Sequence, residues 1–370
     1  MSKFIVPITE PNIGKKDVIN LMKVLYSGNL IQGTKVAELE KLMCQYFGVN
    51  YAVLVSSGTS ALHLALLSIS IGPGDDVITT PYSFIATANA IKLTGANVVF
   101  ADTCKDGVNI CSSSLESKIT PQTKAILIVH EFGISVDFDE IEKISLKYNI
   151  PILEDSACAM GSEHRGTKLG TAGKLSCFSF HPRKIITCGE GGLIITNDRY
   201  LAEYVISMRN HGLTINPISG EKKYIRYGFN YRMTELSASL IIGQLHRIGS
   251  IINKRSAIAK KYFNEITNSN ITFPAYPSNS LFNFQTFPIL LKNRDAANLF
   301  ITHMQEQGIE VTRPAQFIPQ EPSFGVGMLN SKENYPNAFN LWERCVAIPL
   351  FGRMSKKQIK YVIDRINSYE

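Results

Sequence analysis

The stretch YAVLVSSGTSALHLALLSISIGPGDDVITTP, residues 51–81, decides the fold class. It opens with an apolar, β-branched run at 51–57 and continues at 60–71 with apolar residues at helical spacing. The turn signal Gly-Pro-Gly-Asp at 72–75 follows, and 76–81 is β-rich again. This order predicts a strand, a helix and a second strand.

The same alternation continues to about residue 200. It predicts an α/β domain whose mostly parallel sheet is covered by helices on both faces. Ligands bind beyond the carboxyl ends of the strands in such sheets, so polar residues at strand ends are candidate site residues. The runs 177–186 and 191–198 predict two strands joined by a tight glycine-rich turn. The other predicted strands are ANVVFAD (96–102), KAILIVH (124–130) and IPILED (150–155), with helices at IATANAIKL (85–93) and FDEIEKISLKYN (138–149).

The character of the chain changes after about residue 235. A long helical stretch at 236–266 is predicted to connect two domains. Beyond it, the strands 282–291, 309–314 and 345–350 alternate with the helix 294–308, which predicts a smaller α+β domain. We therefore expect a large domain at 1–250, including an N-terminal arm, and a small C-terminal domain at 251–370.

Composition excludes several classes of function. The chain has 370 residues, 45% of them hydrophobic, which is enough for two cores. The net charge of +7 is spread along the chain without a nucleic-acid-binding motif; a positive field also suits an anionic substrate. The seven cysteines are scattered without a C-x-x-C pair and the histidines lack metal-ligand spacing, so no disulfide framework and no metal site is expected. No membrane span or signal peptide is recognisable, which predicts a cytoplasmic protein.

The segment Ser57-Gly58-Thr59-Ser60 follows a predicted strand and opens a predicted helix. Glycine allows a ligand to approach the backbone, and the free amides of the first helical turn, with the Thr59 and Ser60 hydroxyls, make an anion site. The same four residues also suit a plain helix N-cap.

Asp155 ends the predicted strand 150–155. A carboxylate there can pair with the pyridine nitrogen of pyridoxal phosphate (PLP) and keep the ring protonated, which makes the ring an electron sink. A helix cap or a structural salt bridge is the alternative.

Lys184 lies in the segment SFHPRK, residues 179–184. A Schiff base to PLP requires an amine whose pKa is depressed, which desolvation and a cation such as the adjacent Arg183 favour. Ser179 is then placed to bind the cofactor phosphate. The alternative is a solvated lysine in a hairpin.

Phe84, in PYSFIATANAI (81–91), follows the next strand along the chain. A flat side chain at that point can stack on the pyridine ring. Packing in the core is an equally good explanation.

Taken together, these stretches resemble the DegT/StrS family of sugar aminotransferases, which are fold-type I PLP enzymes. The resemblance covers nearly the whole chain, and the order and spacing of EDSA, SFHPRK and GEGG are its most specific part. The matching stretches are SGNLIQGTKVAELEKLM (27–43), SSGTSALHLALL (56–67), IGPGDDVITTPYSFIATANAI (71–91), the run from EDSACAMGSEHRG to GEGGLIITND (154–198), RNHG (209–212) and GFNYRMTEL (228–236).

The resemblance implies a role for each candidate residue. Lys184 would form the internal Schiff base and Asp155 would hold the ring nitrogen. The phosphate would be bound on one side by the residues of this chain and on the other by Asn230 of a neighbouring subunit, which implies a homodimer with a shared active site. Phe84 would lie on the ring, Gly58, Thr59, Ser60 and Ser179 would hold the phosphate, Cys158 would lie near the ring hydroxyl, and Arg313 and His181 are the candidate substrate contacts.

The reaction that the resemblance implies is ping-pong transamination. An amino acid, commonly L-glutamate, loads the cofactor, and a keto-sugar nucleotide then receives the amine. The Thr-Arg-Pro at 312–314, as in perosamine-synthase-like members, favours C4 of a 4-keto-6-deoxy sugar over C3. Arg313 is suited either to the diphosphate or sugar or to a surface salt bridge.

Three positions depart from the family pattern. Many members carry Gln or His where this chain has Cys158, a histidine of the small domain is replaced near Gln285, and the histidine-containing run after residue 314 is missing. These departures concern substrate identity. A sugar 3-dehydratase on the same scaffold would carry histidine in place of Lys184, and a non-catalytic PLP-binding regulator would not need both Asp155 and Lys184, so both alternatives rank below transamination.

Overall fold

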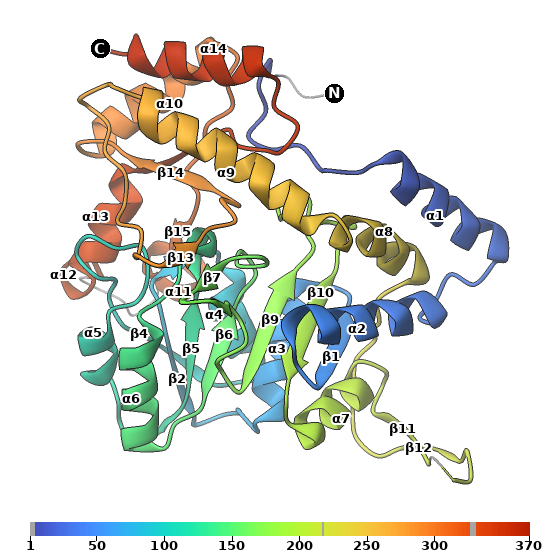
Figure 1. The fold of residues 1–370 in the computed structure, drawn as a ribbon. Helices are drawn as coiled ribbons and strands as arrows, with labels where there is room; N and C mark the ends of the chain where they lie inside the picture. The colour runs from blue at the N-terminus through green and yellow to red at the C-terminus, as the bar shows by residue number, and fades with distance from the viewer. Residues whose placement is uncertain (1–3, 217, 326–330) are drawn as a thin grey trace.

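A seven-stranded sheet forms the centre of the computed structural model, which describes residues 4–216, 218–325 and 331–370. Helices pack on both faces of the sheet (Figure 1). The strand order is β1-β10-β9-β6-β5-β2-β4, and only β10 of these strands runs antiparallel to its neighbours. The predicted α/β fold with a mostly parallel sheet is therefore confirmed. The strands are β1 (Tyr51–Val55), β2 (Asp76–Thr79), β4 (Asn97–Phe100), β5 (Thr123–Val129), β6 (Ile152–Asp155), β9 (Leu175–Ser179) and β10 (Gly192–Thr196).

Both faces of the sheet are apolar because successive side chains of a strand point to opposite sides. In β5, Leu127 packs into the core on one face, whereas Ile126 and Ile128 pack into a core on the other. Neither face meets water, which explains the continuous apolar runs in the sequence. The first face is covered by α3 (Gly58–Ser68), α4 (Ala86–Leu93) and α7 (Arg199–Met208), and the second by α2 (Thr34–Phe47), α5 (Ser112–Glu116), α6 (Phe138–Tyr148) and α8 (Glu235–Leu245).

The connection between β9 and β10 is longer than the predicted tight turn. The two strands pair antiparallel as expected, but β9 ends at Ser179 and residues 180–191 form a loop. Pro182 lacks the amide hydrogen that a longer strand would require. Lys184 consequently lies in a loop at the carboxyl end of β9 rather than within a strand.

The long helical stretch predicted at 236–266 is two helices, α8 and α9 (Ile248–Glu265). They are separated at Arg247, whose guanidinium binds the fully buried Asp17 carboxylate. The predicted domain boundary at residue 250 falls inside α9, which runs along the C-terminal part of the molecule (Figure 1).

A second core lies in the C-terminal part. Here β14 (Phe287–Leu290) pairs antiparallel with β16 (Cys345–Ile348), and α9, α10 (Arg294–Glu306) and α14 (Lys356–Asn367) contribute to the core. Val6 lies in this core and forms a parallel bridge with Ile309, so the N-terminal arm packs on the C-terminal part. The other elements are α1 (Lys15–Ser27), β3 (Tyr82–Ser83), η1 (Glu131–Gly133), β7 (Glu163–His164), β8 (Thr167–Lys168), β11 (Leu213–Ile215), β12 (Lys222–Tyr224), β13 (Ser280–Leu281), β15 (Gln316–Phe317), η2 (Ile318–Gln320), α11 (Pro322–Gly325), α12 (Ser331–Asn334) and α13 (Pro336–Arg344).

Within residues 4–216, 218–325 and 331–370, no three His, Cys, Asp or Glu side chains are grouped so that they would hold a metal ion. No helix in the described part of the chain is long and apolar enough to cross a bilayer. Each of the seven cysteines is a free thiol.

A buried carboxylate ties α8 to the start of α2. Glu235 accepts hydrogen bonds from the backbone amides of Gly33, Lys35 and Val36, at 2.9, 2.7 and 2.9 Å. The first amides of a helix have no partner within the helix and carry partial positive charge, so a carboxylate there is stabilising.

We expect Glu235→Ala to lower the free energy of unfolding by about 3 kcal/mol, because it leaves several buried amides without an acceptor. Urea denaturation followed by circular dichroism measures this. The control is Glu203→Ala, which removes an exposed carboxylate paired with Arg199 and should cost less than about 1 kcal/mol. Equal losses in the two variants would contradict the capping role.

Candidate active site

The carboxyl ends of β9, β6 and β5 open into a cavity of about 600 Å³. Side chains from the C-terminal part and from the N-terminal arm close its other side, among them Ile8, Gln285 and Ile348. The cavity therefore lies where the strand-end rule predicts a ligand site. The sequence-predicted residues that line this cavity are Gly58, Thr59, Phe84, Asp155, Cys158, Ser179, His181 and Lys184.

Lys184 extends into the cavity from the loop after β9. Its Nζ donates a hydrogen bond to Cys158 Sγ at 3.0 Å, and its backbone amide donates to the carbonyl of His181 at 2.8 Å. Burial lowers the pKa of this amine, but the acidic Cys158, Asp155 and Glu131 raise it by more, so the net pKa lies above its ordinary value. The pKa is thus raised where the sequence predicts a depressed value, because acidic neighbours outweigh burial.

Asp155 is buried at the end of β6, on the face that α3 and α4 cover. Its Oδ2 accepts a hydrogen bond from Thr87 Oγ1 at 2.7 Å, and its Oδ1 accepts from the Ala157 amide at 3.2 Å. Burial raises the pKa of this carboxyl, while the two hydrogen bonds and the positive charge of Lys184 oppose the rise. A carboxylate held from two sides keeps its direction toward the cavity.

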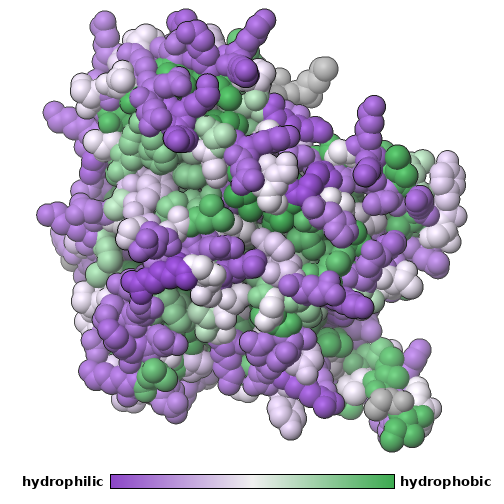
Figure 2. Space-filling view, in the orientation of Figure 1, coloured by the Kyte–Doolittle hydropathy of each residue, from purple (hydrophilic) through white to green (hydrophobic). Residues whose placement is uncertain are grey.

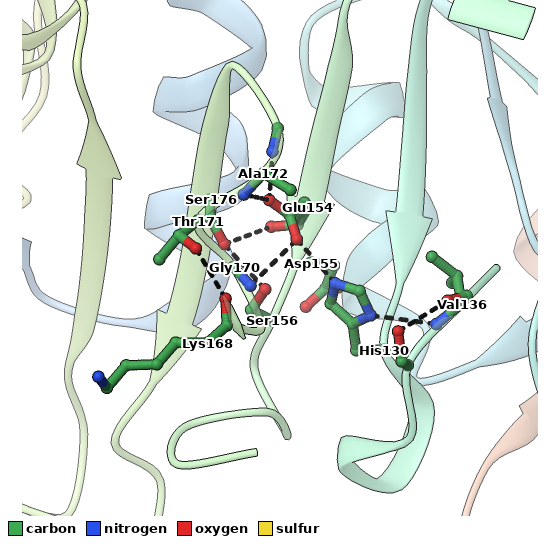
Figure 3. A network of polar contacts seen from close by, with 12 residues as sticks. His130, Val136, Glu154, Asp155, Ser156, Lys168, Gly170, Thr171, Ala172 and Ser176 are labelled. Carbon is green, nitrogen blue, oxygen red and sulfur yellow. Dashed lines mark hydrogen bonds and ion pairs between the residues drawn. The ribbon is translucent and has the colours of Figure 1, made fainter. Parts of the chain in front are cut away.

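The neighbouring Glu154 points to the opposite face of the sheet (Figure 3). Its Oε2 lies 2.7 Å from His130 Nε2, and both side chains are buried. The same carboxylate accepts hydrogen bonds from the amides of Gly170 and Ala172, each at 3.0 Å. His130 in turn donates its own amide to the carbonyl of Asp155 at 3.1 Å, so this network fixes the end of β6 from behind.

The start of α3 forms an anion cradle beside the cavity. The amides of Gly58 and Thr59 are the first two of the helix and have no acceptor within it. A Cβ atom on Gly58 would lie 2.9 Å from the Cβ of Ser179, so only glycine lets the helix approach this side chain. The amides and the Ser179 hydroxyl together suit a phosphate group.

Ser60 differs from its predicted role. Its hydroxyl is buried and lies 2.7 Å from Ser57 Oγ and 3.0 Å from Ser56 Oγ, and its amide is capped by Ser57. It is not among the residues that line the cavity, because its side chain stabilises the helix start instead.

Phe84 and His181 lie at the cavity as predicted. Phe84 follows β3 and is 62% exposed, which is unusual for phenylalanine and rules out packing in the core. The imidazole of His181 accepts the Arg183 amide at 3.3 Å, and burial lowers the pKa of this histidine.

Like Ser60, the predicted residues Arg313 and Asn230 do not line the cavity of their own chain. The Arg313 guanidinium donates to the carbonyls of Trp342 and Glu343, the latter at 2.8 Å, and binds Asn298. Two backbone carbonyls and the Asn298 side chain therefore hold the guanidinium. Asn230 is exposed and forms an isolated bridge with Asn210, away from the cavity-lining residues.

The structure adds residues that the sequence did not single out. Thr87 lies in the first turn of α4, three positions after Phe84. Glu131 follows β5, and its place directly after a predicted strand was an available signal. Ile8 and Thr9 of the N-terminal arm also line the cavity, and no local sequence pattern predicts this.

This set of groups fits PLP. An amine faces the cavity to meet an aldehyde, a buried carboxylate faces it to meet a ring nitrogen, and helix amides with a serine hydroxyl suit the phosphate. The burial of Asp155 and the steric need for Gly58 are observed in this chain itself and do not depend on any relative.

Comparisons with known proteins agree with this geometry. The model of the DegT/DnrJ/EryC1/StrS aminotransferase family matches residues 11–367. The uncharacterized protein MJ1066 of Methanocaldococcus jannaschii is 34% identical, over 98% of this chain and 96% of its own.

Solved structures of sugar aminotransferases and related proteins are similar over nearly the full length. Helicobacter pylori PseC, an aminotransferase involved in the biosynthesis of pseudoaminic acid, is 29% identical with a TM-score of 0.91, and 98% of each chain is covered. The PLP form of Spr1654 from Streptococcus pneumoniae is 26% identical with a TM-score of 0.92 at the same coverage. The chain belongs to the DegT/DnrJ/EryC1/StrS aminotransferase family and is a PLP-dependent sugar aminotransferase.

Proposed function

We propose that this enzyme transfers the amino group of L-glutamate to C4 of a nucleotide-linked 4-keto-6-deoxy sugar. The observation that carries the proposal is the position of Lys184 and Asp155 at one cavity, with the anion cradle of α3 beside them. A cavity of about 600 Å³ has room for a cofactor together with part of a sugar nucleotide.

Each residue then has a chemical task. PLP, when bound, supplies an aldehyde that carries the amino group and a protonated ring that withdraws electrons. Asp155 keeps the ring nitrogen protonated, and Phe84 lies against the ring. Lys184 holds the cofactor. Once displaced, its Nζ moves the proton from the α-carbon of glutamate to the cofactor.

Two features support a nucleotide-linked 4-keto sugar as the substrate: a cation at the cavity and the segment 312–314. Arg183 is exposed at the cavity and offers a cation to an anionic diphosphate, whereas Arg313 is turned away. Thr312 and Pro314, from the segment that resembles perosamine-synthase-like members, both line the cavity. This placement supports amination at C4 over C3.

We also propose a cytoplasmic homodimer that completes each active site with Asn230 of the partner. Apolar side chains are exposed on α1, including Val18, Ile19 and Met22, and on the hairpin of β11 and β12, including Ile215. Figure 2 shows apolar side chains where this hairpin projects from the molecule. Exposed apolar surface of this extent favours a protein partner, and seven free thiols suit a reducing compartment.

We expect Lys184→Ala to reduce transamination by at least about 1000-fold, because cofactor attachment and proton transfer both use this nitrogen. Borohydride reduction followed by peptide mass spectrometry should find the cofactor on Lys184 in the wild type and in the control Lys174→Ala, an exposed lysine. Attachment to another lysine, or turnover retained in Lys184→Ala, would show that the proposed site is wrong.

A panel of 3-keto and 4-keto sugar nucleotides tests the substrate. Glutamate should first change the visible absorbance of the purified enzyme, and mass spectrometry should then detect the amino sugar with the 4-keto-6-deoxy compounds. Product from the 3-keto compounds alone would overturn C4 amination, and an unchanged spectrum with glutamate would overturn the donor.

Co-expression of two inactive variants tests the shared site. If Asn230 acts on the neighbouring subunit, a Lys184→Ala/Asn230→Ala heterodimer contains one site with both residues intact. A random mixture should recover about a quarter of the wild-type activity, since half of the dimers are mixed and each has one intact site. Activity no higher than that of the separate preparations would place Asn230 in its own chain's site or outside any site.

A further inference from the structure

Glu131 is a second buried carboxyl at the cavity for which neither the sequence nor the proposed function has a role. It lies two residues beyond the end of β5, is 4% exposed and lines the cavity. A tight turn holds it: its amide donates to Asn109 Oδ1 at 3.0 Å, and Phe132 adopts a left-handed φ of 58°. Left-handed backbone at a bulky residue is strained and persists where the surroundings enforce it.

The turn packs against the segment that carries Cys158. Gly133, with a φ of 82°, has so little room that a Cβ atom would lie 2.9 Å from the carbonyl oxygen of Cys158. Glu131 and Cys158 are therefore neighbours across the ends of β5 and β6.

The strand order determines which edge of the ring faces Glu131. The phosphate cradle, at Gly58 and Ser179, belongs to the side of β9 and β1, and Glu131 lies on the other side of β6 at the end of β5. In pyridoxal phosphate, the phosphate arm and the ring oxygen lie on opposite sides of the line from the ring nitrogen to the aldehyde carbon. With Asp155 at the nitrogen and Lys184 at the aldehyde carbon, the ring oxygen faces the side of Glu131.

Electrostatics favours a carboxyl that keeps its proton. Burial raises the pKa of Glu131 to about 7, and the negative charge of Asp155 adds to this, while Ser83 and Lys184 oppose it. Two adjacent buried carboxyls do not both ionise readily, and the hydrogen bonds that Asp155 accepts from Thr87 and from the Ala157 amide favour its anion. The titratable groups that face Glu131 are Asp155 and Cys158 at the end of β6, Lys184 after β9, Tyr82 of β3 and Cys345 of β16.

We propose that the protonated carboxyl of Glu131 donates a hydrogen bond to the ring oxygen of the bound cofactor. The neighbouring Cys158 offers only a thiol, which is a weak donor. This inference rests on the proposed function, in which Lys184 binds the aldehyde carbon and Asp155 faces the ring nitrogen. Glu131 is then a positioning residue that makes the state of the ring oxygen depend on pH.

The test uses the full-length enzyme after borohydride reduction, which fixes the cofactor to Lys184 through a stable single bond. Reduction also removes the absorbance changes caused by protonation of the Schiff-base C=N bond. The remaining near-ultraviolet band then depends on the protonation and hydrogen bonding of the pyridine ring. We expect the wild-type band to change with pH, with a midpoint at or above about 7, because an anionic ring oxygen holds the Glu131 proton more tightly. Above this midpoint the carboxylate no longer donates.

Three variants separate the explanations. Glu131→Gln keeps a donor that does not ionise, so the band should keep its low-pH position and lose this transition. Glu131→Leu removes the donor, so the band should be displaced from the wild-type low-pH position at every pH. Glu190→Gln, which removes an exposed carboxylate from the same cavity, should titrate like the wild type.

Two outcomes would overturn the proposal, and they are distinguishable from failure of the proposed function. Titration curves of Glu131→Gln and Glu131→Leu that superimpose on the wild-type curve, with mass spectrometry locating the cofactor on Lys184, would refute the role of Glu131 alone. Cofactor absent from Lys184 in the wild type would refute the proposed function itself. Thermal unfolding of the variants identifies any that do not fold, and the milder Glu131→Gln, which keeps the side-chain shape, then decides.

Discussion

The alternation of side chains along β6 is the constraint on which the site depends. Glu154 and Asp155 are adjacent in sequence and therefore face opposite sides of the sheet. Behind the sheet, Glu154 is bound by His130 and by the amides of the loop at 170–173. If β6 slipped by one residue, each side chain would face the other side of the sheet. Glu154, which binds the loop, would then point into the cavity. The anchored residue thus determines where the functional one points.

One amine among several acids gives the cavity its electrostatic character. The carboxyls of Asp155 and Glu131 and the thiol of Cys158 all have raised pKa values, chiefly because they are buried, and Lys184 is the cation that offsets them. The charge state of each group therefore depends on the others. An amine that bonds to an aldehyde changes this balance, which makes the neighbouring acids part of the chemistry rather than a passive lining.

The site is assembled from segments that are far apart in the chain. The N-terminal arm reaches the cavity through Ile8 and Thr9, since Val6 is fixed in the C-terminal core by its bridge to Ile309. β3 and β15 also pair, which joins the segment before Phe84 to the segment after Pro314. The room left for substrate consequently depends on how the two cores pack on each other, and not on the sheet alone.

The sequence by itself determined the α/β fold, the strand-end position of the cavity and eight of the residues that line it, because apolar periodicity and strand ends are local signals. The sequence left open the pKa of Lys184, the direction of Arg313 and the choice between phosphate binding and helix capping for Ser60. Only the tertiary structure decided these, since a pKa depends on charges that the fold brings together and a side-chain direction depends on available partners. Glu131 illustrates the difference, because its position after β5 is visible in the sequence, whereas its burial beside Asp155 exists only once the strands are placed side by side.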